Sequence, residues 1–297
     1  MSVSTPEQIL RRVDWEIVRR LDGMLQGDYR SLLYGYGVDF ADLREYQPGD
    51  DVRYIDWNVT ARLGDAYIRQ YVEDREITAW FLVDLSPSLE FGSAARTKRE
   101  MLIDFVATFA RLLTRHGNRV GAMIMVSGIE RVIPVRTGRL QVLRLIHELT
   151  EQPRVGTTVM TDLGTLLRAA QGSFHRRSLV MIASDFISSP GWETQLKVMN
   201  RRHDVVAVRI SDPGEREIPD VGGMVVEDSE TGVQMYVDTH DPVFRRRFRA
   251  AAENREQGLR SAFNRAGVDA LWLSADEDPV RAFVRFAALR GKRRRAA

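Results

Sequence analysis

Apolar residues recur along the chain with two different periods, which predict where helices and strands lie. Near the N-terminus they follow a helical spacing, at Leu10, Val13, Ile17, Leu21 and Met24. Thr5 and Gln8 precede this run and provide a capping box, with Pro6 between them at the first helical position. We therefore expect one amphipathic helix that ends near Gly27 and packs its apolar face against the rest of the protein.

The periodicity fades between residues 28 and 71, where glycine, aspartate, arginine and aromatic residues dominate. These residue types are typical of turns, so we expect little regular structure in this stretch. A loop-rich segment of this length inside a compact protein is usually functional or held by specific polar contacts.

From residue 76 onwards, short apolar strands alternate with amphipathic helices. We expect strands at 76–83, 119–126, 131–135, 178–183, 204–210 and 270–274. We expect helices at 97–116, 139–151, 163–172, 192–201, 242–266 and 279–290. This alternation predicts an α/β fold with a doubly wound, mostly parallel sheet of the Rossmann type, and a β-hairpin at 222–227 and 233–238 interrupts it.

The predicted organisation has three parts. Residues 1–75 form an N-terminal helix and loop-rich region, residues 76–290 form the α/β domain, and residues 291–297 form a basic tail. The formal charge is +2, but five basic and no acidic residues lie within the last eight. The preceding 289 residues hold 38 basic against 41 acidic side chains, so the body of the protein is mildly acidic.

Composition narrows the classes of function. The chain has no cysteine, which excludes disulfides, thiolate nucleophiles and cysteine-bound metal centres. Apolar runs such as 79–83 and 120–126 are far shorter than a membrane-spanning helix, and no signal-like apolar segment follows Met1. We therefore expect a cytoplasmic protein without an integral membrane segment.

Polar side chains that can bind a cation follow the ends of two predicted strands. Asp84, Ser86 and Ser88 come after the first strand as D-x-S-x-S, and Asp185 follows the strand at 178–183. Thr161 stands before the helix at 163–172, with Thr157 and Thr158 as nearby alternatives. Because ligands of open α/β sheets bind beyond the carboxyl ends of strands, these five side chains are expected to converge.

Hydroxyl and carboxylate oxygens are the ligands preferred by hard divalent cations such as Mg²⁺ or Mn²⁺. Ser86 and Ser88 would bind the ion directly and Thr161 directly or through water, while Asp84 and Asp185 would hold bound waters. With few carboxylates in contact, the ion would stay electrophilic and attract a carboxylate from a partner. A simple Ser/Pro turn without metal remains the alternative.

These residues resemble the metal-ion-dependent adhesion site of von Willebrand factor A domains. A second resemblance rests on residues 36–57, which read YGVDFADLREYQPGDDVRYIDW, with Thr60 and Arg62 following. This segment, together with Arg202, His203 and Asp204, is similar to the hallmark of domain-of-unknown-function family 58. The resemblance implies a von Willebrand factor A-like domain that works beside a MoxR-type AAA+ ATPase, as an adaptor or co-chaperone for client proteins.

Two other readings compete with a non-enzymatic adaptor. Asp50, Asp51 and Asp56 form an acidic cluster that would suit a metal-dependent phosphoester hydrolase. The interleaved arginines Arg44, Arg53 and Arg62 favour internal ion pairs instead. The basic tail and the arginines at 245–249 offer only a weak signal for nucleic acid, so no nucleic-acid partner is expected. No P-loop or nucleophile elbow is present in the sequence.

Overall fold

The structure is a computed structural model. It describes residues 5–15, 43–47, 50, 52, 55–69, 76–93, 95–153, 161–228 and 231–296. The described part contains no helix that is long and apolar enough to cross a membrane.

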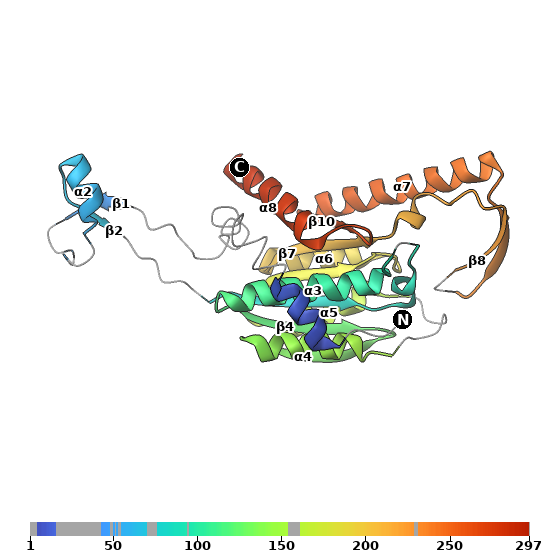
Figure 1. The fold of residues 1–297 in the computed structure, drawn as a ribbon, viewed down its shortest axis with the longest axis horizontal. Coiled ribbons are helices and arrows are strands. Elements are labelled where there is room, and N and C mark those ends of the chain that lie inside the picture. The colour runs from blue at the N-terminus through green and yellow to red at the C-terminus, as the bar shows by residue number, and fades with distance from the viewer. Residues whose placement is uncertain are drawn as a thin grey trace.

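A six-stranded sheet forms the centre of the protein (Figure 1). Its strands, in chain order, are β3 (Thr78–Asp84), β4 (Arg119–Met125), β5 (Ile129–Arg136), β6 (Leu179–Ser184), β7 (Asp204–Ser211) and β10 (Asp269–Ser274). They lie in the order β10-β7-β6-β3-β4-β5, and every pair is parallel except β4 with β5. The inner strands β6 and β7 are buried along their whole length, as expected where helices cover both faces of a parallel sheet.

Helices cover the two faces of this sheet in separate groups. One hydrophobic cluster joins the sheet to α3 (Lys98–Arg115), α4 (Arg139–Thr150) and α8 (Pro279–Ala296). A second cluster joins it to α5 (Leu163–Ser173), α6 (Trp192–Arg202) and α7 (Pro242–Ala266). The predicted doubly wound α/β architecture is confirmed. Helix α8 continues to Ala296, beyond Arg290 where the sequence pattern placed its end.

The predicted N-terminal helix is present at residues 6–15. Its capping box has formed, because the Thr5 amide donates to Gln8 and the Gln8 amide donates to the Thr5 hydroxyl. Leu10 and Val13 are buried in the cluster that contains α3, and Asp14 pairs with Arg111 of α3 at 2.5 Å. The expected continuation to Gly27 lies outside the described residues.

The segment expected to have little regular structure contains three short elements in its described part. These are β1 (Leu43–Glu45), α2 (Trp57–Leu63) and β2 (Tyr67–Arg69), with β1 and β2 paired antiparallel. Asp56 accepts from the Val59 amide at the start of α2, and Gly64 after the helix has a φ of 88°. The described part of the segment thus holds only short elements, and β1 and β2, with three residues each, are too short to display an apolar period.

The predicted hairpin consists of β8 (Gly223–Glu227) and β9 (Gln234–Asp238), paired antiparallel. In Figure 1 it stands beyond one end of the sheet, where α7 begins. Chain order explains this position, because the hairpin follows the carboxyl end of β7 and the short turn η3 (Pro213–Glu215).

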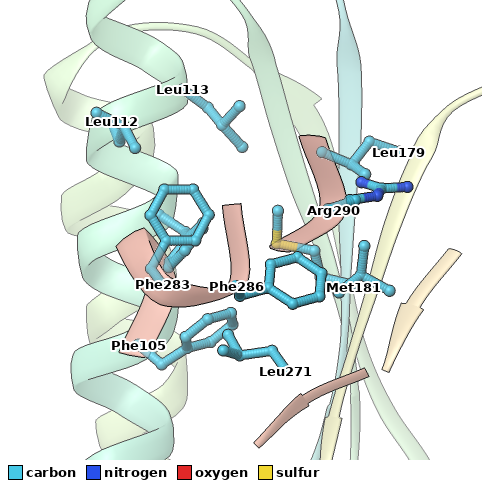
Figure 2. A pocket seen from close by; sticks show the side chains of 11 residues that line it. Phe105, Leu112, Leu113, Leu179, Met181, Leu271, Phe283, Phe286 and Arg290 are labelled. Atoms are coloured by element: carbon cyan, nitrogen blue, oxygen red, sulfur yellow. The ribbon is translucent and has the colours of Figure 1, made fainter. Parts of the chain in front are cut away.

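A small apolar cavity of about 20 Å³ lies between α3, α8 and the sheet (Figure 2). Phenylalanine side chains of both helices line it, and room for about one water is left. Arg290 lies at its wall and pairs with Asp204 and, at 2.8 Å, with Asp269. These ion pairs fix α8 to the first residues of β7 and β10.

Candidate functional site at the switch point of the sheet

The strand order reverses between β3 and β6. From β3 the chain proceeds to β4 and β5 on one side, then returns to β6, β7 and β10 on the other. Crevices at such switch points, beyond the carboxyl ends of strands, are the usual ligand sites of doubly wound folds. Asp84 is the last residue of β3, and Asp185 directly follows β6. The structure therefore brings these two predicted residues to the same place.

Asp84 is fully buried, and two serines hold its carboxylate. One carboxylate oxygen accepts from the Ser86 amide at 3.0 Å, and the other accepts from the Ser184 hydroxyl at 2.7 Å. The Ser184 hydroxyl in turn accepts from the Phe186 amide at 2.8 Å. These bonds connect the ends of β3 and β6 and fix the orientation of the carboxylate.

The hydroxyl groups of Ser86 and Ser88 also meet at this point. Both serines are buried at the start of the turn η2 (Pro87–Glu90), and their Oγ atoms are 3.1 Å apart. Two adjacent ligands in an octahedral Mg²⁺ shell, each about 2.1 Å from the ion, lie about 3 Å apart. The spacing of the two hydroxyls therefore fits neighbouring ligand positions around such an ion.

The charge state of Asp84 is perturbed. Burial, followed by repulsion from Asp185, raises the pKa of Asp84 to about 7, while the Ser184 and Ser86 hydrogen bonds oppose the rise. A carboxylate in this environment is stabilised by any nearby cation.

Lys98 supplies one cation to the site. The side chain is 1% exposed, and its ammonium donates to Asp185 at 2.7 Å and also pairs with Glu215 of η3. Burial disfavours the charged form of both Asp185 and Lys98. The ion pair nevertheless prevails, lowering the pKa of the carboxyl and raising that of the ammonium.

A chain of charges, buried at Lys98 and Arg209 and part-buried at its two glutamates, continues from Lys98 to α7. Glu215 also pairs with Arg209 of β7 at 3.1 Å, and Arg209 pairs with Glu256 of α7 at 3.2 Å. Together with Asp84 and Asp185, this chain gathers four carboxylates around two cations. The excess of carboxylates is the electrostatic condition that favours a divalent ion or a protonated Asp84.

Thr161 lies at the entrance to α5 and is buried. Its carbonyl oxygen accepts from the Ser189 amide at 2.9 Å and from the Ser188 hydroxyl at 3.0 Å. Thr161 is thereby tied to the loop that follows Asp185. The alternatives Thr157 and Thr158 lie outside the described residues.

The acidic cluster before the α/β domain has a structural role where the structure describes it. Asp56 caps α2, and Asp50 accepts from the Gln47 amide at 2.9 Å. Asp51 and Arg53, which belong to the predicted ion pairs, lie outside the described residues. Within the described part, no three His, Asp or Glu side chains are grouped as a metal site would require. The switch-point site instead combines the Ser86 and Ser88 hydroxyls with its two carboxylates, while the hydrogen bonds of the Thr161 carbonyl link that residue to the loop after Asp185.

Sequence reasoning missed Lys98 and Arg209. A lysine in the first turn of a helix opposes the helix dipole, so Lys98 carried a signal that a specific anion lies nearby. Arg209 interrupts a strand that is otherwise apolar from Val205 to Ile210, which is the corresponding signal for a buried ion pair.

Comparison with known proteins identifies relatives along nearly the whole chain. The protein is 36% identical over 281 residues to the uncharacterized protein Rv1480 of Mycobacterium tuberculosis, covering 95% of this chain and 88% of that protein. It is 33% identical over 154 residues to the uncharacterized protein MAV169 of Mycobacterium avium, covering 52% of this chain and 90% of the relative.

Similar solved structures include the conserved hypothetical protein BatB from Bacteroides thetaiotaomicron. It has 13% sequence identity and a TM-score of 0.45, covering 73% of this chain and 99% of that one. The SpRpn10 VWA domain has 14% sequence identity and a TM-score of 0.33, and the match covers 46% of this chain and 75% of that domain. The model of the family described as protein of unknown function DUF58 matches residues 42–258. The chain therefore belongs to the DUF58 family, as the motif at residues 36–57 predicts.

Proposed function

We propose that this protein is a non-enzymatic interaction adaptor whose switch-point site binds Mg²⁺ or another divalent cation. Through this ion it recognises an acidic group of a partner. The resemblance of residues 36–57 implies a MoxR-type AAA+ ATPase or its client as that partner, with the protein acting as a co-chaperone in the cytoplasm.

The observation that supports this proposal most is the convergence of buried oxygens at the switch point. Asp84, Ser86, Ser88 and Asp185 are each no more than 1% exposed, although none of these residue types favours burial without a partner. An ion held by the Ser86 and Ser88 hydroxyls would relieve the repulsion between Asp84 and Asp185. The same ion would keep an electrophilic position for a ligand, because its direct protein ligands are neutral.

The turn η3 lies beside the buried cation Lys98 of the site. Asp212 accepts from the Ser93 amide at 3.1 Å, and the Gly214 amide donates to the Ser93 hydroxyl at 3.0 Å. These bonds tie η3 to the loop between η2 and α3, while Glu215 of the same turn pairs with Lys98. We propose that a partner carboxylate enters when η3 moves aside and takes over the place of Glu215.

Affinity capture tests the proposal. Purified protein is immobilised and mixed with the MoxR-type ATPase of the same cell, either in MgCl₂ or in EDTA. The MgCl₂ concentration is about 5 mM, so that even a weak Mg²⁺ site is filled. We expect capture in Mg²⁺ and its loss in EDTA. Asp84→Ala and Ser88→Ala should both abolish capture. Ser173→Ala, at an exposed serine that ends α5 near the amino ends of the strands, serves as the control.

Equal capture by all variants, with their folds intact by circular dichroism, would contradict the adaptor role of this site. Metal-dependent turnover of nucleotides or generic phosphoesters by the same samples would favour the hydrolase instead.

A further inference from the structure

The hairpin β8–β9 presents an exposed apolar centre with an acidic rim. Residues directly opposite each other in an antiparallel pair share one face. On the outer face these pairs are Val225 with Tyr236, Gly223 with Asp238, and Glu227 with Gln234. Val225 is 60% and Tyr236 is 72% exposed, whereas Val237 on the inner face is buried.

Tyr236 is held flat on this face. A side chain at Gly223 would collide with the Tyr236 ring and hydroxyl, so the ring lies across the bare backbone of the glycine. An aromatic ring placed in this way covers a glycine in a strand and restricts its own motion. The outer face therefore offers an open, preorganised π surface next to Val225.

The hairpin itself is acidic, whereas the first turns of α7 beside its base carry arginines at 245–247 and 249. Residues 217–241 contain seven aspartates and glutamates and no lysine or arginine. At the base of the hairpin, Asp220 pairs with Arg245 at 3.2 Å and Glu217 pairs with Arg249 at 2.9 Å, both from α7. Glu227 and Asp238 flank the Tyr236 ring on the outer face and are exposed.

A two-stranded hairpin on its own is only marginally stable in water. Within the described part of the chain, no third strand pairs with β8 or β9. Figure 1 shows the hairpin beyond the end of the main sheet rather than packed on its faces. A two-stranded sheet with exposed outer edges of this kind can bind an added segment.

We propose that the outer face of β8–β9 is a docking surface for a basic segment of a partner protein. The aliphatic stem of a lysine or arginine packs on Val225 and Tyr236, its cationic head lies over the Tyr236 ring, and Glu227 and Asp238 receive the flanking charges. The acidic rim repels nucleic acid, anionic membranes and the same face of a second copy. This surface is independent of the cation site, which recognises the opposite charge.

Fluorescence anisotropy with labelled peptides tests this surface in the full-length protein. The probe is a peptide of alternating lysine and valine, and the control peptide has glutamate in place of each lysine. All measurements use EDTA, so that failure of the proposed cation site leaves the result unaffected. We expect the lysine peptide to bind more tightly than the glutamate peptide, and more weakly as salt is raised.

Two kinds of variant locate the binding. Tyr236→Ser and the pair Glu227→Gln with Asp238→Asn should each weaken binding of the lysine peptide about tenfold or more. Leu140→Ser, at a side chain 80% exposed on α4, and the pair Glu130→Gln with Glu151→Gln are the matched controls and should bind as the parent does.

Unchanged binding by both kinds of hairpin variant, or equal binding of the glutamate peptide, would overturn the proposal. Replacement of the three arginines at 293–295 by glutamine distinguishes a partner from the chain's own tail. A tenfold gain in peptide affinity in that variant would mean that the tail occupies the surface, which would overturn the assignment to a partner protein. Direct binding of a labelled DNA duplex to the hairpin, lost in Tyr236→Ser, would overturn it as well.

Discussion

Asp84→Asn isolates the charge imbalance at the switch point. The raised pKa of Asp84, about 7, means that the folded protein holds a proton that the unfolded chain releases near pH 4. The associated stability is fully present below about pH 4 and is lost as pH rises to about 7. Asparagine keeps the shape and the acceptor oxygen for the Ser86 amide but carries no charge, so the variant lacks this pH dependence.

The size of the effect follows from the pKa. Above pH 5 the wild type loses about 1.4 kcal/mol of stability for each pH unit until the pH reaches the pKa of Asp84, about 7. The range from pH 5 to pH 8 therefore contains about two such pH units. We therefore expect its free energy of unfolding to fall by about 3 kcal/mol relative to Asp84→Asn over this range. Urea unfolding in EDTA, followed by tryptophan fluorescence at pH 5 and pH 8, measures this difference.

Magnesium provides the second part of this test. An ion that binds only the folded state at 100 times its Kd adds about 2.7 kcal/mol. At pH 8, saturating MgCl₂ should therefore restore most of the lost stability in the wild type and have no effect on Asp84→Asn. Identical pH dependence in the two proteins would refute the electrostatic reasoning, and equal stabilisation by MgCl₂ would refute the role of Asp84 at the ion.

Three further predictions concern other contacts. Lys98→Met leaves Asp185 without the buried ammonium of Lys98, and should lower the free energy of unfolding by about 3–5 kcal/mol, measured with urea in EDTA. The same variant should bind Mg²⁺ at least tenfold more tightly, measured by calorimetry. Equal Mg²⁺ affinity would contradict competition between the ammonium and the ion. Arg290→Met removes the arginine that pairs with Asp204 and Asp269, and should lower the free energy of unfolding by about 3 kcal/mol. The Mg²⁺ affinity of this variant should be unchanged. Gly121→Ala places a methyl group 2.7 Å from the Ile133 carbonyl oxygen, and should lower the free energy of unfolding by about 1–3 kcal/mol. An unchanged unfolding midpoint in urea would mean that β4 and β5 move apart at no cost.

Much of the fold could be predicted because its elements are long and strongly periodic. Helix α7 has the predicted bounds, Pro242–Ala266, since proline and Asp241 define its start and Gly267 its end. The short strands β1 and β2 were missed because antiparallel pairing with each other, and not an apolar period, stabilises them.

The candidate site could be predicted in part. Asp84 and Asp185 follow apolar strands, so the parallel topology alone brings them together. The buried ion pairs of Lys98 could not be derived in the same way, because Glu215 follows a different strand and is 117 residues distant in sequence. Three-dimensional proximity of this kind depends on the strand order, which the sequence pattern leaves open.

The most direct measurement for the central claim is a crystal of the protein soaked in MnCl₂, with anomalous scattering recorded near the manganese edge. The account predicts one octahedral ion beside Asp84, with the Oγ atoms of Ser86 and Ser88 as neighbouring ligands at about 2.1–2.2 Å. An anomalous map without a peak at this position, with the Lys98–Asp185 ion pair intact in the same crystal, would contradict it.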